Sequence, residues 1–298
     1  MNTNGKADMN ARGQTDDELA QEHRRASLEH WQEAASGWKA RRQQLRRFTM
    51  PVSAAMIEAI DPQPGQRILE LAAGLGDTGF VAAELVAPAG TLICSDQSEA
   101  MLDAARERSA ELNVSNVEFR VLNAEWIDLP VASVDAVLCR WGYMLMADPA
   151  AALLETRRVL RPGGRLALAV WDAIERNPWA ALPSVELLGR GLIEPPAPGT
   201  PGPFVLGNSG KVEGLLEEAG FSDVSVEAID IEHRTSSFDE FWETNLDLSR
   251  VFHDAVLACP QEQIEEIRGR LAERLEPYAL ADGSLVIPAR TLVAAASA

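Results

Sequence analysis

Short apolar runs alternate with helical patterns along residues 67–170, and this alternation limits the possible folds more than any other feature of the sequence. Most of the apolar runs are almost uninterrupted, as in parallel strands that are covered on both faces. The runs lie at 67–72, 91–95, 117–122, 134–139 and 165–170, and helical patterns lie at 76–85, 98–112 and 148–160. Strands joined by helices need right-handed crossovers, so the sequence predicts an open α/β structure with a parallel sheet.

The composition of the segments outside this alternation predicts how the rest of the chain is organised. Residues 1–15 lack apolar periodicity, which predicts a disordered tail. We expect helices that cover the core at 16–60, the α/β core at 61–171, and a proline-rich cover loop at 172–208. Beyond that loop we expect the core to continue at 209–236, a helical lid insertion at 237–281, and a last core strand with a tail at 282–298.

The predicted N-terminal helices carry two features that could have a function. Trp31 and Trp38 are seven residues apart and share one helical face, which could dock the segment onto the core. A basic run also occurs here, made of Lys39, Arg41, Arg42, Arg46 and Arg47. Such a run can bind an anion, although it is more often the solvated face of a helix.

Length and charge exclude several classes of protein. A chain of 298 residues can bury a large core without disulfides or a structural metal. A net charge of −18 disfavours nucleic acid or an anionic membrane surface as the main partner. The three cysteines are widely spaced and form neither a disulfide framework nor a metal-binding pair. Because we find neither a signal peptide nor an apolar stretch that could span a membrane, we expect a cytoplasmic protein.

A glycine-rich segment follows the first predicted strand. Residues 70–79 read Glu-Leu-Ala-Ala-Gly-Leu-Gly-Asp-Thr-Gly, which places a G-x-G-x-x-G spacing between a strand and a helix. Glycines there let the backbone approach a ligand and present N–H groups at a helix N-terminus. Asp96 ends the second strand 20 residues after Gly76, where its carboxylate can accept hydrogen bonds from a ribose. Together these features predict a cofactor that contains a nucleoside.

The position of Glu70 discriminates between two such cofactors. Its carboxylate lies at the carboxyl end of the first strand, four residues before Gly74. An acid there is poorly placed beside the pyrophosphate of a dinucleotide. It suits S-adenosylmethionine, which carries a sulfonium and an ammonium group and no phosphate. The sequence therefore favours S-adenosylmethionine over NAD.

The ordered motifs of residues 38–221 resemble those of class I S-adenosylmethionine-dependent methyltransferases, in particular the small-molecule branch that includes ubiquinone/menaquinone-biosynthesis C-methyltransferases. Residues 70–79 look like the first motif of that family, with Ala72 where many members have glycine. The resemblance implies a Rossmann-like, seven-stranded, mostly parallel sheet with helices on both faces, N-terminal helices and a helical insertion near the C-terminus. It also implies S-adenosyl-L-methionine as the cofactor and S-adenosyl-L-homocysteine as its product.

The same resemblance assigns cofactor-binding positions. Asp96 and Gln97 match the ribose-binding acid and its neighbour beside the adenine, and residues 123–125 resemble the motif that reads the adenine. Asn123 departs from the usual Asp, but its side-chain oxygen can still accept a hydrogen bond. The full set of positions is Glu70, Ala72, Gly74, Gly76, Asp96, Gln97, Asn123, Ala124, Glu125, Arg140 and Trp141.

Aromatic residues in the predicted covers indicate an apolar acceptor, although the same residues could simply pack the covers onto the sheet. We expect a small aromatic, polyketide, terpenoid or quinone-like molecule that is methylated on carbon or oxygen. The residues predicted to line its site are Tyr143, Phe204, His233 and Trp242, while no catalytic base and no metal ligand can be named. Two alternatives stay open: an NAD(P)-dependent oxidoreductase, and an S-adenosylmethionine-binding protein without catalysis. The insertion could equally form a homodimer interface.

Overall fold

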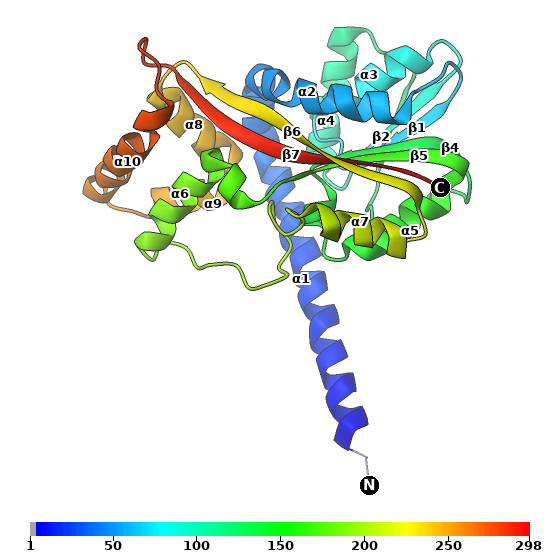
Figure 1. Cartoon of the computed structure of the whole chain (residues 1–298), viewed down its shortest axis with the longest axis horizontal. Coiled ribbons are helices and arrows are strands. Elements are labelled where there is room, and N and C mark those ends of the chain that lie inside the picture. Colours follow the sequence, from blue (N-terminus) through cyan, green and yellow to red (C-terminus); the bar gives the residue numbers. More distant parts are fainter. Residues whose placement is uncertain (1–3) are drawn as a thin grey trace.

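A seven-stranded sheet organises the chain in the computed structural model, which describes residues 4–298, with side chains described from residue 17 onward (Figure 1). The strand order is β3-β2-β1-β4-β5-β7-β6. The first five strands pair in parallel, and β7 lies between β5 and β6, antiparallel to both. The bounds are β1 Arg67–Glu70, β2 Thr91–Asp96, β3 Val117–Val121, β4 Val134–Arg140, β5 Leu160–Trp171, β6 Ser222–Thr235 and β7 Leu285–Ser297. This arrangement confirms the predicted mostly parallel α/β sheet.

Helices cover both faces of the sheet. Three of them connect parallel strands: α3 (Asp77–Val86), α4 (Glu99–Leu112) and α5 (Pro149–Val159). In Figure 1, α2 (Arg42–Ile60) and α3 lie on one face, with α5 and α7 (Ser209–Glu218) on the other. Because both faces are covered, apolar strand residues such as Ile68, Leu92 and Val137 have no exposed surface, which explains their uninterrupted apolar runs.

The first helix, α1 (Asn4–Ala40), packs against α4 and α8. Trp31 and Trp38 make an edge-to-face contact 5.3 Å apart and pack against Leu75 and Met101, so they do dock this helix onto the core. Residues 1–3 of the predicted disordered tail lie outside the described residues. The backbone of residues 4–15 continues α1 instead of forming a tail, and the segment contains no proline that would interrupt a helix.

A second group of helices packs at one end of the sheet (Figure 1). It consists of α6 (Pro178–Gly189), α8 (Phe238–Leu248), α9 (Arg250–Leu257) and α10 (Gln261–Leu275), which share an apolar core with the start of β7. Short 3₁₀ helices occur at η1 (Tyr143–Leu145), η2 (Ile174–Arg176) and η3 (Glu276–Tyr278). No helix in the described part of the chain is long and apolar enough to cross a membrane.

Helix α6 differs from the sequence prediction, which treated residues 172–208 as an irregular loop. Pro178 occupies the first turn of the helix, where the N–H groups have no partner within the helix and proline is tolerated. Leu187 is buried in the core that α6 shares with α10. The predicted loop is therefore interrupted by η2 and α6, and its long irregular part runs from residue 190 to residue 208.

Candidate functional site

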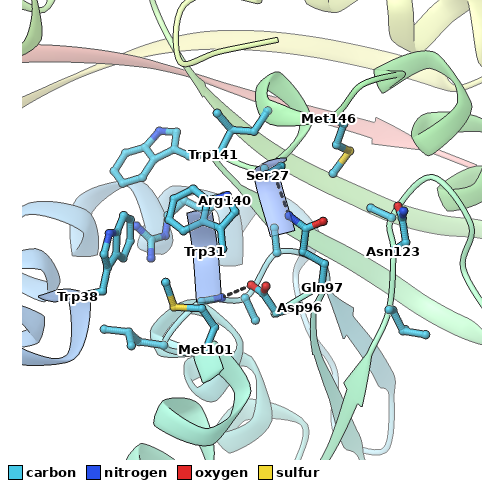
Figure 2. A pocket seen from close by; sticks show the side chains of 18 of the residues that line it. Ser27, Trp31, Trp38, Asp96, Gln97, Met101, Asn123, Arg140, Trp141 and Met146 are labelled. Carbon is cyan, nitrogen blue, oxygen red and sulfur yellow. Dashed lines mark hydrogen bonds between the residues drawn. The ribbon is translucent and has the colours of Figure 1, made fainter. Parts of the chain in front are cut away.

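One pocket lies at the carboxyl ends of β1–β4, beneath α1, and encloses about 1030 Å³ of empty space, including its open mouth. We call it the main pocket. All predicted cofactor positions except Glu70 and Gly76 line it, namely Ala72, Gly74, Asp96, Gln97, Asn123, Ala124, Glu125, Arg140 and Trp141. Figure 2 shows Asp96 and Gln97 between an aromatic side, with Trp31, Trp38 and Trp141, and a more polar side with Asn123. The structure thus brings together residues that are far apart in the sequence.

Two carboxylates hold the glycine-rich turn between β1 and α3. The backbone N–H of Gly74 donates to Asp96 Oδ2 over 2.9 Å, and that of Gly79 donates to Glu70 Oε1 over 3.0 Å. The other oxygen of Asp96 accepts from the N–H of Ser98, also over 2.9 Å. Burial raises the pKa of Asp96, while these backbone hydrogen bonds act in the opposite direction. The turn is therefore preformed, with a carboxylate at the pocket wall.

Glu70 lies beneath the turn and does not line the main pocket. Its side chain is buried, and Oε2 has no hydrogen-bond partner among the residues that the structure describes. Burial raises the pKa of Glu70 to about 8, although the nearby Arg140 guanidinium partly opposes the shift. Gly79 leaves the necessary room, because a Cβ atom there would lie 2.3 Å from Oε2. Glu70 thus supports the first turn of α3 from below.

The other residues of the turn are explained by backbone geometry. Gly76 has φ +78° at the start of α3 and does not line the main pocket. Ala72, which stands where many family members have glycine, has φ +49°. A non-glycine residue is strained in this left-handed region. Its methyl group has space because residue 142 is glycine: a Cβ there would lie 2.7 Å from that of Ala72.

Residues of α1 lie over the main pocket and contact Gln97 and Glu125, two residues predicted to lie near the adenine. Arg24 donates from Nε and Nη2 to Glu125 Oε2 over 2.9 and 2.7 Å, and the other oxygen of Glu125 accepts from the N–H of Ala147. Gln97 Nε2 donates to Ser27 Oγ over 2.9 Å (Figure 2). Both Gln97 and Glu125 therefore contact the helix above the pocket as well as the pocket itself.

Sequence reasoning missed these α1 residues. Three polar side chains of the helix, His23, Arg24 and Ser27, line the main pocket together with Trp31 and Trp38. Ser27 and His23 precede Trp31 by four and eight residues, so they lie on the same face of the helix. That spacing is the signal in the sequence that could have identified them.

The aromatic side of the main pocket contains one cation. The Nε of Arg140 donates to Thr78 Oγ1 over 3.0 Å, and its guanidinium lies 4.8 Å from the ring of Trp141. Burial lowers the pKa of Arg140, while Glu70 and Asp77 raise it. Arg140 is thus oriented by a hydroxyl and an aromatic ring, as an anion-binding group at the pocket wall needs to be.

An aromatic cluster continues from Trp141 to His233. Trp141 stacks on Trp171 at 4.2 Å, Trp171 stacks on Phe48 at 5.7 Å, and Phe48 contacts His233 edge-on at 5.2 Å. His233 is buried, and its Nδ1 has no hydrogen-bond partner in the described part of the chain. Burial lowers the pKa of His233 to about 4, so the imidazole is neutral at pH 7. His233 does not line the main pocket, and the cluster connects this buried, neutral imidazole with Trp141 at the pocket wall.

The remaining predicted acceptor residues do not line the main pocket. Tyr143 is fully buried in the main core, where its hydroxyl lies 2.6 Å from Thr156 Oγ1. Trp242 belongs to the core of the C-terminal helices and contacts Phe252. Phe204 packs against the main core and is half-buried. The structure therefore places these three aromatic residues in packing positions.

Comparisons with known proteins agree with this geometry. Residues 62–187 match the family model described as "Methyltransferase domain". The chain is 28% identical to nocamycin O-methyltransferase of Saccharothrix syringae over 64% of this chain and 71% of that protein. It is 35% identical to a ubiquinone/menaquinone biosynthesis C-methyltransferase of Pasteurella multocida over 41% of this chain and 43% of that protein.

A solved structure shows the same fold over a larger part of the chain. The YcgJ protein of Bacillus subtilis matches 82% of this chain and 97% of its own length, with a TM-score of 0.55 at 17% identity. The chain spans less than half the length of most of the curated relatives that it matches. Residues 62–187 of this chain are a methyltransferase domain of the S-adenosylmethionine-dependent class.

Proposed function

We propose that the protein transfers a methyl group from S-adenosylmethionine to carbon or oxygen of a small, largely apolar acceptor. The observation that carries this proposal is that backbone N–H groups of the glycine-rich turn already donate to carboxylates of the protein. Those of Gly74 and Gly79 donate to the carboxylates of Asp96 and Glu70. A dinucleotide would need such donors for its pyrophosphate. A turn bounded by two carboxylates disfavours that anion and suits a cofactor without phosphate.

The residues of the main pocket fit the parts of this cofactor. The carboxylate of Asp96 has lone pairs left for ribose hydroxyls, and Asn123 has an amide beside the expected adenine site. Met101 and Trp31 provide apolar walls on the side of the pocket opposite Asn123 (Figure 2). Arg140 provides a cation for the carboxylate of the methionine portion. We propose these residues, with the other predicted positions that line the pocket, as the cofactor site.

The cofactor supplies a methyl group already activated on a positively charged sulfur. The chain has to hold the acceptor atom in line with that group and exclude water. The aromatic cluster that includes Trp141 and Phe48 can hold an apolar acceptor in place. Helix α1 closes the pocket and thereby excludes water. Where the acceptor must lose a proton, we propose neutral His233 as the polar group that accepts it.

The parts outside the core then act as covers. We propose that residues 16–60 close the main pocket, and that residues 172–208 and 237–281 form the outer walls of the acceptor site beside it. The contacts of Phe48 with Trp179 and of His233 with Phe241 support this view, because they join all three segments to one aromatic cluster.

Calorimetric titration of the full chain with S-adenosylhomocysteine tests the cofactor. We expect one-site binding that weakens at least about tenfold in Asp96→Asn, because each lost hydrogen bond to a carboxylate contributes about 1.5–3 kcal/mol. Asp103→Asn, on an exposed face of α4, is the matched control and should bind like the unmodified chain. Saturable binding of NADH with no binding of S-adenosylhomocysteine would contradict the proposal and favour the oxidoreductase.

Turnover tests the remaining alternative. The protein is incubated with S-adenosylmethionine and a panel of phenols, quinols and polyketides, and S-adenosylhomocysteine formation is measured. We expect product only with apolar acceptors. Cofactor binding without product for any acceptor would favour a binding protein, and methylation of proteins or nucleic acids alone would refute the acceptor class.

A further inference from the structure

A second hollow lies beside the main pocket, where α2 faces the start of α3 and the body of α4. Its lining consists mainly of Arg42, Arg46, Arg47 and Arg108, together with Asp77 and Met50. We call it the arginine hollow. Asp77 also lines the main pocket, so the two sites share a wall. Four arginines around one hollow are unexpected in a chain with a net charge of −18.

Two of the four arginines are held in place by carboxylates. Arg42 Nη1 donates to one carboxylate oxygen of Glu111 over 2.9 Å, and Arg108 Nη1 donates to the other oxygen over 3.1 Å. Arg108 Nε also lies 3.7 Å from Asp77 Oδ1. Both side chains are mostly shielded, with exposed fractions of 29% for Arg42 and 18% for Arg108. These contacts fix two guanidinium groups, one from α2 and one from α4, at the wall of the hollow.

The other two arginines have no such contacts. Arg46 and Arg47 are exposed, and neither side chain makes an ion pair or hydrogen bond with any side chain that the structure describes. Arg42 and Arg46 are four residues apart on α2, a spacing at which like charges destabilise a helix. Four guanidinium groups thus face two carboxylates, and the hollow keeps an excess of two positive charges.

We propose that the arginine hollow binds a phosphate group. Guanidinium groups bind phosphate oxygens through paired hydrogen bonds, and several of them can share one phosphate. A phosphate monoester carries about −1.5 to −2 charges at pH 7, which balances the local excess. Arg42 and Arg108 form the fixed part of the site, and Arg46 and Arg47 close on the ligand. The ligand is inorganic phosphate, pyrophosphate or a phosphorylated small molecule, held next to the site of methyl transfer.

Calorimetry of the full chain with pyrophosphate and with glycerol 3-phosphate tests this inference. The test variant is Arg46→Ala/Arg47→Ala. The control variant, Arg165→Ala/Arg176→Ala, removes the same charge from two exposed arginines of β5 and η2. We expect one-to-one binding that weakens at least tenfold in the test variant, stays unchanged in the control, and weakens further as salt is added.

The two probes distinguish the source of the phosphate. Binding of glycerol 3-phosphate supports a phosphorylated metabolite, and binding of pyrophosphate alone supports a free inorganic ligand. Equal affinity in the test and control variants, or no saturable binding of either probe, overturns the proposal. Titration with S-adenosylhomocysteine should give the same affinity in both variants, so a failed cofactor site is recognised separately.

Discussion

The ion pair between Arg24 and Glu125 ties α1 to the edge of the main pocket, and Arg24→Ala should weaken that tie measurably. Arg24 donates twice to one oxygen of Glu125, whose side chain is only 8% exposed, while Arg24 itself is 36% exposed. A hydrogen bond to a charged group contributes about 1.5–3 kcal/mol, and an exposed ion pair about 0–1 kcal/mol. We expect an intermediate value of about 1–2 kcal/mol, which is a factor of about 5–30 in the opening equilibrium of α1.

Amide hydrogen exchange measures this opening directly. Amides of α1 around Arg24 should exchange about tenfold faster in Arg24→Ala, and amides of the central strand β1 should not change. Arg25→Ala is the matched control, because the one ion pair that Arg25 makes with a described side chain is with Glu29 of the same helix, and Arg25 is 80% exposed. If both variants exchange alike, the ion pair does not hold α1 over the pocket and the reasoning is refuted.

Three further predictions concern residues of the turn and of the aromatic cluster. The pKa of Glu70 in the folded protein, about 8, lies above its ordinary value of 4.5. The free energy of unfolding should therefore fall as the pH rises from 4.5 to 8, by up to about 1.4 kcal/mol per pH unit. Urea unfolding of Glu70→Gln should show a flatter dependence on pH, and a dependence equal to that of the unmodified chain would contradict the assignment. Gly142→Ala should lower the unfolding free energy by about 1–3 kcal/mol, because its Cβ would meet both the Sγ atom of Cys139 and the methyl group of Ala72. Ala72→Gly should restore part of that loss in thermal unfolding of the double variant, and strictly additive effects would show that the two residues do not touch. His233→Asn should reduce the rate of methyl transfer without changing the affinity for S-adenosylhomocysteine. If the rate and the affinity fall by the same factor, His233 has a structural role instead.

The features that the sequence predicted well are those encoded locally. The strands β1, β2 and β4 have apolar runs because both of their faces are buried, and such runs can be recognised one at a time. The turn after β1 and Asp96 at the end of β2 could be placed together because parallel strands bring their carboxyl ends to one edge of the sheet.

The features that sequence reasoning missed depend on contacts between distant segments. Arg24 and Glu125 are 101 residues apart, and no local pattern links them. Tyr143 and Trp242 are aromatic residues in the expected regions, but residue type does not reveal whether a ring faces a pocket or a core. The whole range 172–208 was predicted as a proline-rich loop, whereas α6 occupies Pro178–Gly189 within it, and proline in a first helical turn is compatible with that helix.

The position of β7 has a consequence for synthesis of the chain. β7 pairs with β6 from Leu285 to Ser297 and with β5 from Thr291 to Ser297, and it separates β5 from β6 in the strand order. It is also the last strand of the sheet to leave the ribosome. Until it emerges, the completed strands β5 and β6 each present an unpaired edge, the kind of surface on which nascent chains associate with one another. The growing polypeptide is therefore most exposed to aggregation after the methyltransferase domain has been synthesised and before residues 285–297 are available.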